Sequence, residues 1–138
     1  MEQLAVEIVG LCREYGECRV EVERMEEARR VKNARESVCA MARQRLDISD
    51  PALLLALLDA CEVTRDEGML QEVLDVVGRN LDRLAVSAES VKLLACCYYY
   101  VEEEECVERA GRMLEELRKM GRGEEELADV ETILEELT

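Results

Sequence analysis

The chain has 138 residues and a net charge of −15, from 33 acidic and 18 basic side chains, and it contains no His, Trp or Phe. The missing imidazole excludes Ser-His-Asp and Cys-His catalysis, histidine metal ligands and an ordinary group that titrates between pH 5 and 8. Because this net negative charge repels phosphate groups, we expect neither nucleic acid nor an anionic membrane as a partner.

Composition and length predict a single domain spanning residues 1–138, because 49% apolar residues suffice for one aliphatic core. Glu outnumbers Asp, and Asn and Gln are few, a balance that indicates a thermophilic source. The acidic N-terminal segment does not resemble a signal peptide. The longest apolar run, residues 52–58, is too short to span a membrane, so we expect a cytoplasmic protein.

The first third predicts two helical segments. An apolar stripe favours a helix from Gln3 to Tyr15, with Gly16 as its C-terminal stop. Residues 18–46 contain no helix breaker and predict one long helix or two helices in line. Its narrow stripe suits a helix at the edge of a bundle or the seam of a coiled-coil dimer. The stripe is a candidate interaction surface around these residues: Val31, Ala34, Val38 and Met41.

Residues 51–120 predict two helical hairpins. Asp50 and Pro51 are a strong helix start, and the helix over 51–64 is apolar nearly all round, so it should be central and buried. A second helix covers about 69–84, and Ser87 is positioned to cap a third. After Val101 the apolar stripe changes phase, which predicts a turn or kink within 102–105.

The C-terminal part predicts a helix that Gly121 and Gly123 terminate, and a last helix over 124–138. No segment alternates at period two. The predicted fold is therefore all-α, with about seven helices in stacked antiparallel hairpins, a helical bundle or short α-solenoid.

The two hairpins within 51–120 align with each other at a displacement of about 37 residues. In the second hairpin, Leu94, Ala95 and Tyr98 form a large, small and aromatic series, and Ala110 and Leu114 follow in its second helix. This pattern resembles the tetratricopeptide-like repeat proteins. The first hairpin departs from it, with Asp59 in the aromatic position. The resemblance implies a protein-binding scaffold of stacked helix pairs.

The tyrosines and cysteines have structural and functional interpretations. Tyr98, Tyr99 and Tyr100 cannot all face one way on a helix, so at least one is exposed or lies at a partner surface.

The seven cysteines contain no Cys-x-x-Cys pair and predict no metal site. We interpret them as small buried apolar residues, and a thermophilic source would also permit one or two internal disulfides.

A rival pattern lies in the last third, where Glu104, Glu105 and Glu108 are followed by Glu126 and Asp129. This spacing resembles the EExxE and ExxD motifs of all-α nucleoside triphosphate pyrophosphohydrolases of the MazG type. The resemblance implies that carboxylates on two helices hold Mg²⁺ on a triphosphate, chemistry that needs no histidine.

The favoured functional interpretation is a small acidic protein–protein interaction module, an adaptor or a subunit of an assembly, with no catalytic residue, cofactor or metal ion. Its expected partner is another protein with a basic face, and a homodimer is the alternative. The competing function is the Mg²⁺-dependent pyrophosphohydrolase.

Overall fold

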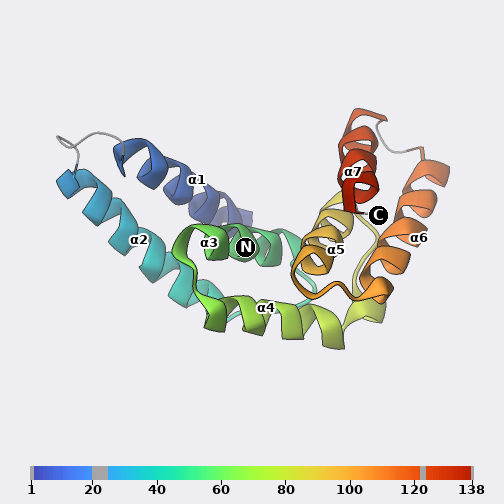
Figure 1. The fold of residues 1–138 in the computed structure, drawn as a ribbon, viewed down its shortest axis with the longest axis horizontal. Helices are drawn as coiled ribbons and strands as arrows, with labels where there is room; N and C mark the ends of the chain where they lie inside the picture. The colour runs from blue at the N-terminus through green and yellow to red at the C-terminus, as the bar shows by residue number, and fades with distance from the viewer. Residues whose placement is uncertain (1, 20–24, 122–123, 138) are drawn as a thin grey trace.

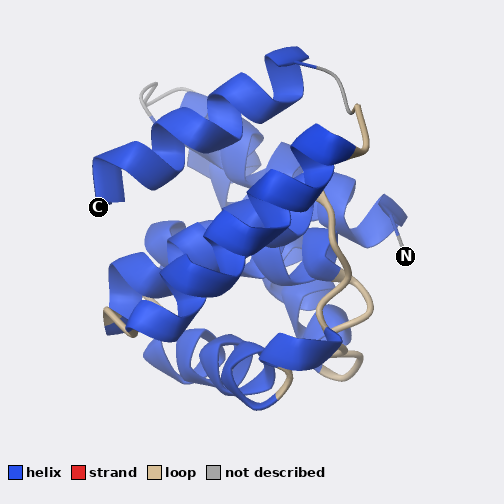
Figure 2. Ribbon diagram, turned by 90° about the vertical axis from the view of Figure 1, so that its right-hand side faces the viewer, coloured by secondary structure: helices blue, strands red, loops and turns tan. Residues whose placement is uncertain are grey.

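The computed structural model describes residues 2–19, 25–121 and 124–137, and at positions 2, 18, 19, 124–126 and 137 it describes the backbone alone. The described residues form seven α-helices and no strand, as Figure 2 shows, which confirms the predicted all-α fold. The helices are α1 (Glu2–Arg19), α2 (Met25–Arg43), α3 (Pro51–Thr64), α4 (Glu67–Arg79), α5 (Ala88–Val101), α6 (Glu104–Lys119) and α7 (Glu124–Leu137).

The helices are arranged as a crescent of hairpins (Figure 1). Three pairs consecutive in the chain pack together, α1 with α2, α3 with α4, and α5 with α6, and α7 packs on α5 and α6. The first helices of the pairs are also neighbours, since α1 packs on α3 and α3 on α5. In Figure 1, α4 follows the outer edge, while α1 and the α5–α7 group rise on either side of α3.

Helix α3 is the centre of this arrangement, as its composition predicts. Asp50 caps it, since its Oδ1 accepts a hydrogen bond from the Leu53 N–H at 3.2 Å, and Pro51 occupies the first turn. Arg65 ends it with a left-handed backbone (φ 57°). Its buried side chains join one core that extends from α1 to α7: Leu53, Leu54, Ala56, Leu57, Leu58, Ala60 and Cys61.

Two other predicted boundaries are confirmed. The Ser87 Oγ accepts a hydrogen bond from the Ser90 N–H at 3.1 Å and caps α5. Glu102 adopts a left-handed conformation (φ 52°) between α5 and α6, which is the break that the phase change predicts. Arg79 ends α4 sooner than predicted, and residues 81–83 form a 3₁₀ turn.

The first helix boundary was predicted wrongly. Helix α1 continues through Gly16 to Arg19, and α2 begins at Met25 rather than near residue 18. A glycine inside a helix costs only about 1 kcal/mol, which the packing of α1 on α2 and α3 offsets. Figure 1 shows α2 running back alongside α1, so the pair is a hairpin at the edge of the bundle.

Candidate binding site on the inner face

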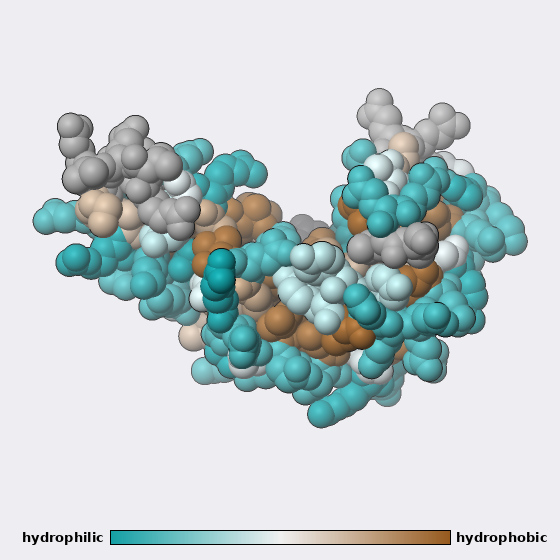
Figure 3. All heavy atoms as spheres, in the orientation of Figure 1, coloured by the Kyte–Doolittle hydropathy of each residue, from teal (hydrophilic) through white to brown (hydrophobic). Residues whose placement is uncertain are grey.

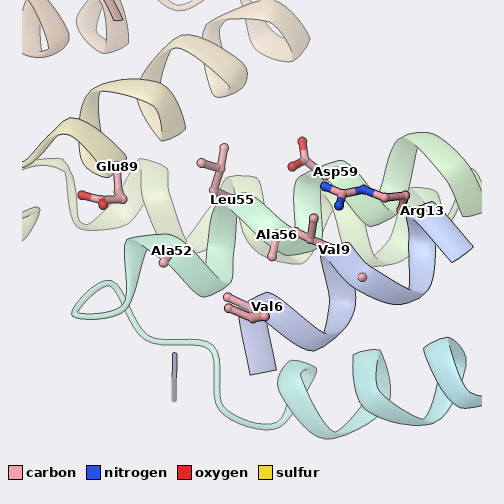
Figure 4. A pocket seen from close by; sticks show the side chains of 10 residues that line it. Val6, Val9, Arg13, Ala52, Leu55, Ala56, Asp59 and Glu89 are labelled. Atoms are coloured by element: carbon pink, nitrogen blue, oxygen red, sulfur yellow. The ribbon is translucent and has the colours of Figure 1, made fainter. Parts of the chain in front are cut away.

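The inner face of the crescent carries an open hollow of about 370 Å³ between α1 and α3, with the start of α5 at one end. Figure 4 shows Val6, Val9 and Arg13 on α1, a row of α3 side chains opposite, and Glu89 on α5. We call it the aliphatic hollow, and its lining consists of Ala5, Val6, Val9, Gly10, Arg13, Ala52, Leu55, Ala56, Asp59 and Glu89.

The hollow exists because two helices carry more apolar surface than their neighbours cover. On α1, Ala5 and Ile8 are buried, whereas Val6 and Val9 lie on another face and are 73% and 39% exposed. On α3, apolar residues encircle the helix, and Leu55 is left half-buried at the hollow. In Figure 3, hydrophobic side chains are visible in the middle of the crescent, between largely hydrophilic arms.

A second hollow, of about 110 Å³, follows on the same face between α3 and α5. We call it the tyrosine hollow, and its lining consists of Leu58, Asp59, Glu62, Cys96, Tyr99 and Tyr100. The Tyr100 hydroxyl donates a hydrogen bond to Glu62 Oε1 at 3.1 Å. The Tyr99 ring stands edge-on to Tyr100, with ring centres 5.3 Å apart, and is 65% exposed.

Asp59 lies at the junction, because it lines both hollows. Partial burial between their apolar walls raises the pKa of its carboxyl group, and the charge of Glu62 raises it further. The charged residues of the two linings are three acids, Asp59, Glu62 and Glu89, and one base, Arg13. In Figure 4 the Arg13 side chain extends toward Asp59. The face is thus apolar within each hollow, with negative charge at their junction and margins.

The three tyrosines differ in environment. Tyr98 is half-buried against the core, Tyr100 is half-buried with its hydroxyl bonded to Glu62, and Tyr99 is exposed. At least one of three consecutive tyrosines was expected to be exposed, and Tyr99 is that residue. Tyr99 and Tyr100 therefore belong to the inner face, whereas Tyr98 packs against the core.

The stripe predicted on residues 18–46 does not form one exposed surface. Val31 and Val38 are buried, with 7% and 8% of their surface exposed, because α2 turns this side toward α1. Ala34 and Met41 are exposed. A dimer seam along all four residues would need two side chains that the hairpin already covers.

The carboxylates of the rival enzyme pattern do not form a cluster among the described side chains. Glu104, Glu105, Glu108 and Asp129 are all exposed, and the Glu126 side chain lies outside the described ones. No group of three metal-ligating side chains occurs within the part of the chain described. Glu104, Glu105 and Glu108 lie in the first turns of α6, whereas Asp129 lies toward the middle of α7, and the two helices run in opposite directions (Figure 1).

The cysteines are mostly core residues. The six whose side chains are described, Cys12, Cys39, Cys61, Cys96, Cys97 and Cys106, are all free thiols. The disulfides that the sequence permits are thus not found among these six, and the Cys18 side chain lies outside the described ones. Burial raises the pKa of each of the six thiols, to about 12 for Cys61 and about 11 for Cys96.

Comparison with known proteins gave no match to a family model, a curated protein or a solved structure. Among the described helices, none combines the length and apolarity that crossing a membrane requires. The inner face is therefore interpreted from its own geometry.

Sequence reasoning missed Val6, Val9 and Leu55 as surface residues. The available signal was an acid, Asp59, within an otherwise apolar helix, together with apolar α1 residues outside its buried stripe.

Proposed function

We propose that this chain is a small acidic protein–protein interaction module, an adaptor or a subunit of an assembly, whose partner binds on the inner face. The observation that carries this proposal is the aliphatic hollow, where Val6 and Val9 are exposed on a strongly charged protein. A contiguous apolar surface with a polar rim is typical of an interaction site. Its role is then binding rather than catalysis.

The order of the helices supports this function. The inner helices α1, α3 and α5 are consecutive neighbours, and the two hollows between them share Asp59. In stacked helical hairpins, such a concave surface is the part that offers the longest contact to a partner. The half-buried Leu55 and the exposed Tyr99 add aliphatic and aromatic contacts on one face.

The test is selection of binding peptides from a displayed random library on the immobilised protein. Enriched peptides should bind the native chain, and Val9→Glu should weaken this binding by at least about tenfold, because it places a charge in the aliphatic hollow. Val63→Glu is the matched control, since Val63 is also an exposed valine and lines neither hollow. Enriched peptides that ignore Val9→Glu, or no enrichment at all, would contradict the proposed function.

A further inference from the structure

We propose that the occupant of the inner face is a cationic amphipathic α-helix, which inserts aliphatic side chains into the aliphatic hollow and places a Lys or Arg beside Asp59. The inference rests on the proposed function and names the chemistry of its partner. It follows from the charge of the face, the spacing of the residues on α3, and the kinds of peptide recognition that an all-helical surface permits.

Charge complementarity selects a cation. Three carboxylates and one guanidinium occur in the linings of the two hollows, so the face carries a net negative charge within a chain of net charge −15. Asp59 lies in the middle of this face, where it lines both hollows and is exposed, so its carboxylate is accessible to a partner. A Lys or Arg of the partner would form a charge-assisted hydrogen bond with this carboxylate, and it would also approach Glu62.

The spacing on α3 selects a helix. Ala52, Leu55, Ala56 and Asp59 occupy positions i, i+3, i+4 and i+7, so they share one face over two turns, about 10 Å. Figure 4 shows this row on α3 opposite Val6 and Val9 on α1. A groove between two helices accepts the ridges of a third. The aliphatic hollow is more than twice the volume, about 150 Å³, that holds a benzene-sized ring, so it can receive several aliphatic side chains.

Other modes of peptide recognition fit less well. Strand addition needs an exposed sheet edge, and the described residues contain no strand. Recognition of phosphorylated segments uses several arginines, whereas Arg13 is the single basic residue in the linings of the two hollows. Insertion of an amphipathic helix into an apolar groove requires what the inner face has, a hollow with charged residues at its margins.

The probe is a fluorescent Leu/Lys peptide of about 18 residues, which is long enough to be helical. The control peptide has the same sequence with Glu in place of every Lys. Fluorescence anisotropy at physiological ionic strength should show saturable binding of the Leu/Lys peptide and no binding of the Glu peptide. Asp59→Asn should weaken it by about tenfold, the effect expected when a charged hydrogen bond is lost. Thermal unfolding of each variant verifies that it is folded.

Glu115→Gln is the matched control, because it also removes one negative charge but lies on α6, outside both hollows. It should change the dissociation constant by less than about twofold, since an exposed charge far from the peptide is screened. Equal weakening by Asp59→Asn and Glu115→Gln would mean unspecific attraction to an acidic protein and would overturn the inference. Binding of the Glu peptide to Asp59→Lys would support it, because exchanging the charges preserves the pair.

The experiments separate this inference from the proposed function. Peptides from the displayed library that depend on Val9, but lack basic residues and ignore Asp59→Asn, would overturn the inference and leave the function standing. Absence of any Val9-dependent peptide would overturn both. A second copy of the chain is the other possible occupant, and sedimentation velocity tests for it. A dimer that dissociates in Val9→Glu but persists in Val63→Glu would assign the face to a second copy and overturn the inference.

Discussion

The hydroxyl group of Tyr100 in α5 donates a hydrogen bond to Glu62 Oε1 in α3, across 3.1 Å and 38 residues of sequence. This bond joins two inner helices and holds a carboxylate of the tyrosine hollow in place. Burial, followed by this hydrogen bond, raises the pKa of Tyr100. The pair therefore links the stability of the fold to the form of the candidate site.

Replacing Tyr100 by Phe should lower the free energy of unfolding by about 0.5–1 kcal/mol, because one partly exposed hydrogen bond is lost while the ring remains. Urea unfolding at pH 7 measures the change. Tyr99→Phe is the control, since that ring is exposed, and it should alter stability by less than about 0.5 kcal/mol. Equal effects of the two variants would contradict a specific role for the bond.

Asp59→Asn should stabilise the protein at neutral pH while weakening peptide binding. A carboxyl group with a raised pKa in the folded state binds its proton more tightly there, so its contribution to stability decreases as pH rises through that pKa. The difference in unfolding free energy between variant and native protein should thus increase from pH 3 to pH 7. A difference that stays constant over this range would show that Asp59 is as well hydrated in the folded state as in the unfolded chain.

Leu57→Ala should destabilise the protein by about 2–5 kcal/mol, because Leu57 lies in the centre of α3 with no exposed surface, and its truncation leaves a cavity. Val63→Ala, at an exposed position on the same helix, should change stability by less than about 0.5 kcal/mol. Chemical denaturation of both variants tests whether α3 is the central helix. Comparable small losses for the two would contradict that assignment.

The thiols should react with iodoacetamide in an order set by burial. Cys97 and Cys106 are buried and their pKa values are raised, so almost no reactive thiolate forms at pH 8. Cys12 is half-buried, and the nearby Arg35 offsets part of the effect of burial on its pKa. Peptide mapping by mass spectrometry should find Cys12 alkylated before Cys97 and Cys106 in the native protein. In denaturant the alkylation rates of the three cysteines should become similar. Equal alkylation rates of the three in the native protein would contradict an order set by burial.

Arg43 joins the end of α2 to α4 through two hydrogen bonds to Glu72, from Nη2 at 2.7 Å and from Nε at 3.0 Å. A double-mutant cycle with Arg43→Gln and Glu72→Gln should give a coupling energy below about 1 kcal/mol, since both side chains are partly exposed. The hydrogen bond from Arg43 lowers the pKa of Glu72. The coupling is therefore present at neutral pH and should disappear as acid protonates Glu72. A coupling that persists in strong acid would exclude a charge-based interaction.

The helix ends that the sequence predicted correctly depend on local chemistry. Asp50 and Ser87 bond to backbone N–H groups three residues later, and the break at Glu102 follows from a shift in the phase of the apolar stripe. Such signals involve neighbours in the chain and can be seen without the fold. Gly16 was misjudged for the opposite reason, since its place inside α1 depends on packing against α2 and α3.

The candidate site was largely out of reach of sequence reasoning. Val31 and Val38 have the periodicity of an interaction stripe, yet α1 covers them. Val6 and Leu55 have the composition of core residues, yet the curvature of the hairpin stack leaves them uncovered. A hydrophobic pattern states which faces are apolar but not which neighbour covers each.

The sequence alone determined the all-α class, the seven helices of the described segments, most of their ends and the acidic surface, because periodicity, capping and charge act between residues close in the chain. Only the tertiary structure decided that α1, α3 and α5 line one inner face and that Asp59 lies between two hollows on it. That outcome depends on contacts between helices tens of residues apart, and their packing order sets which apolar surface remains open to a partner.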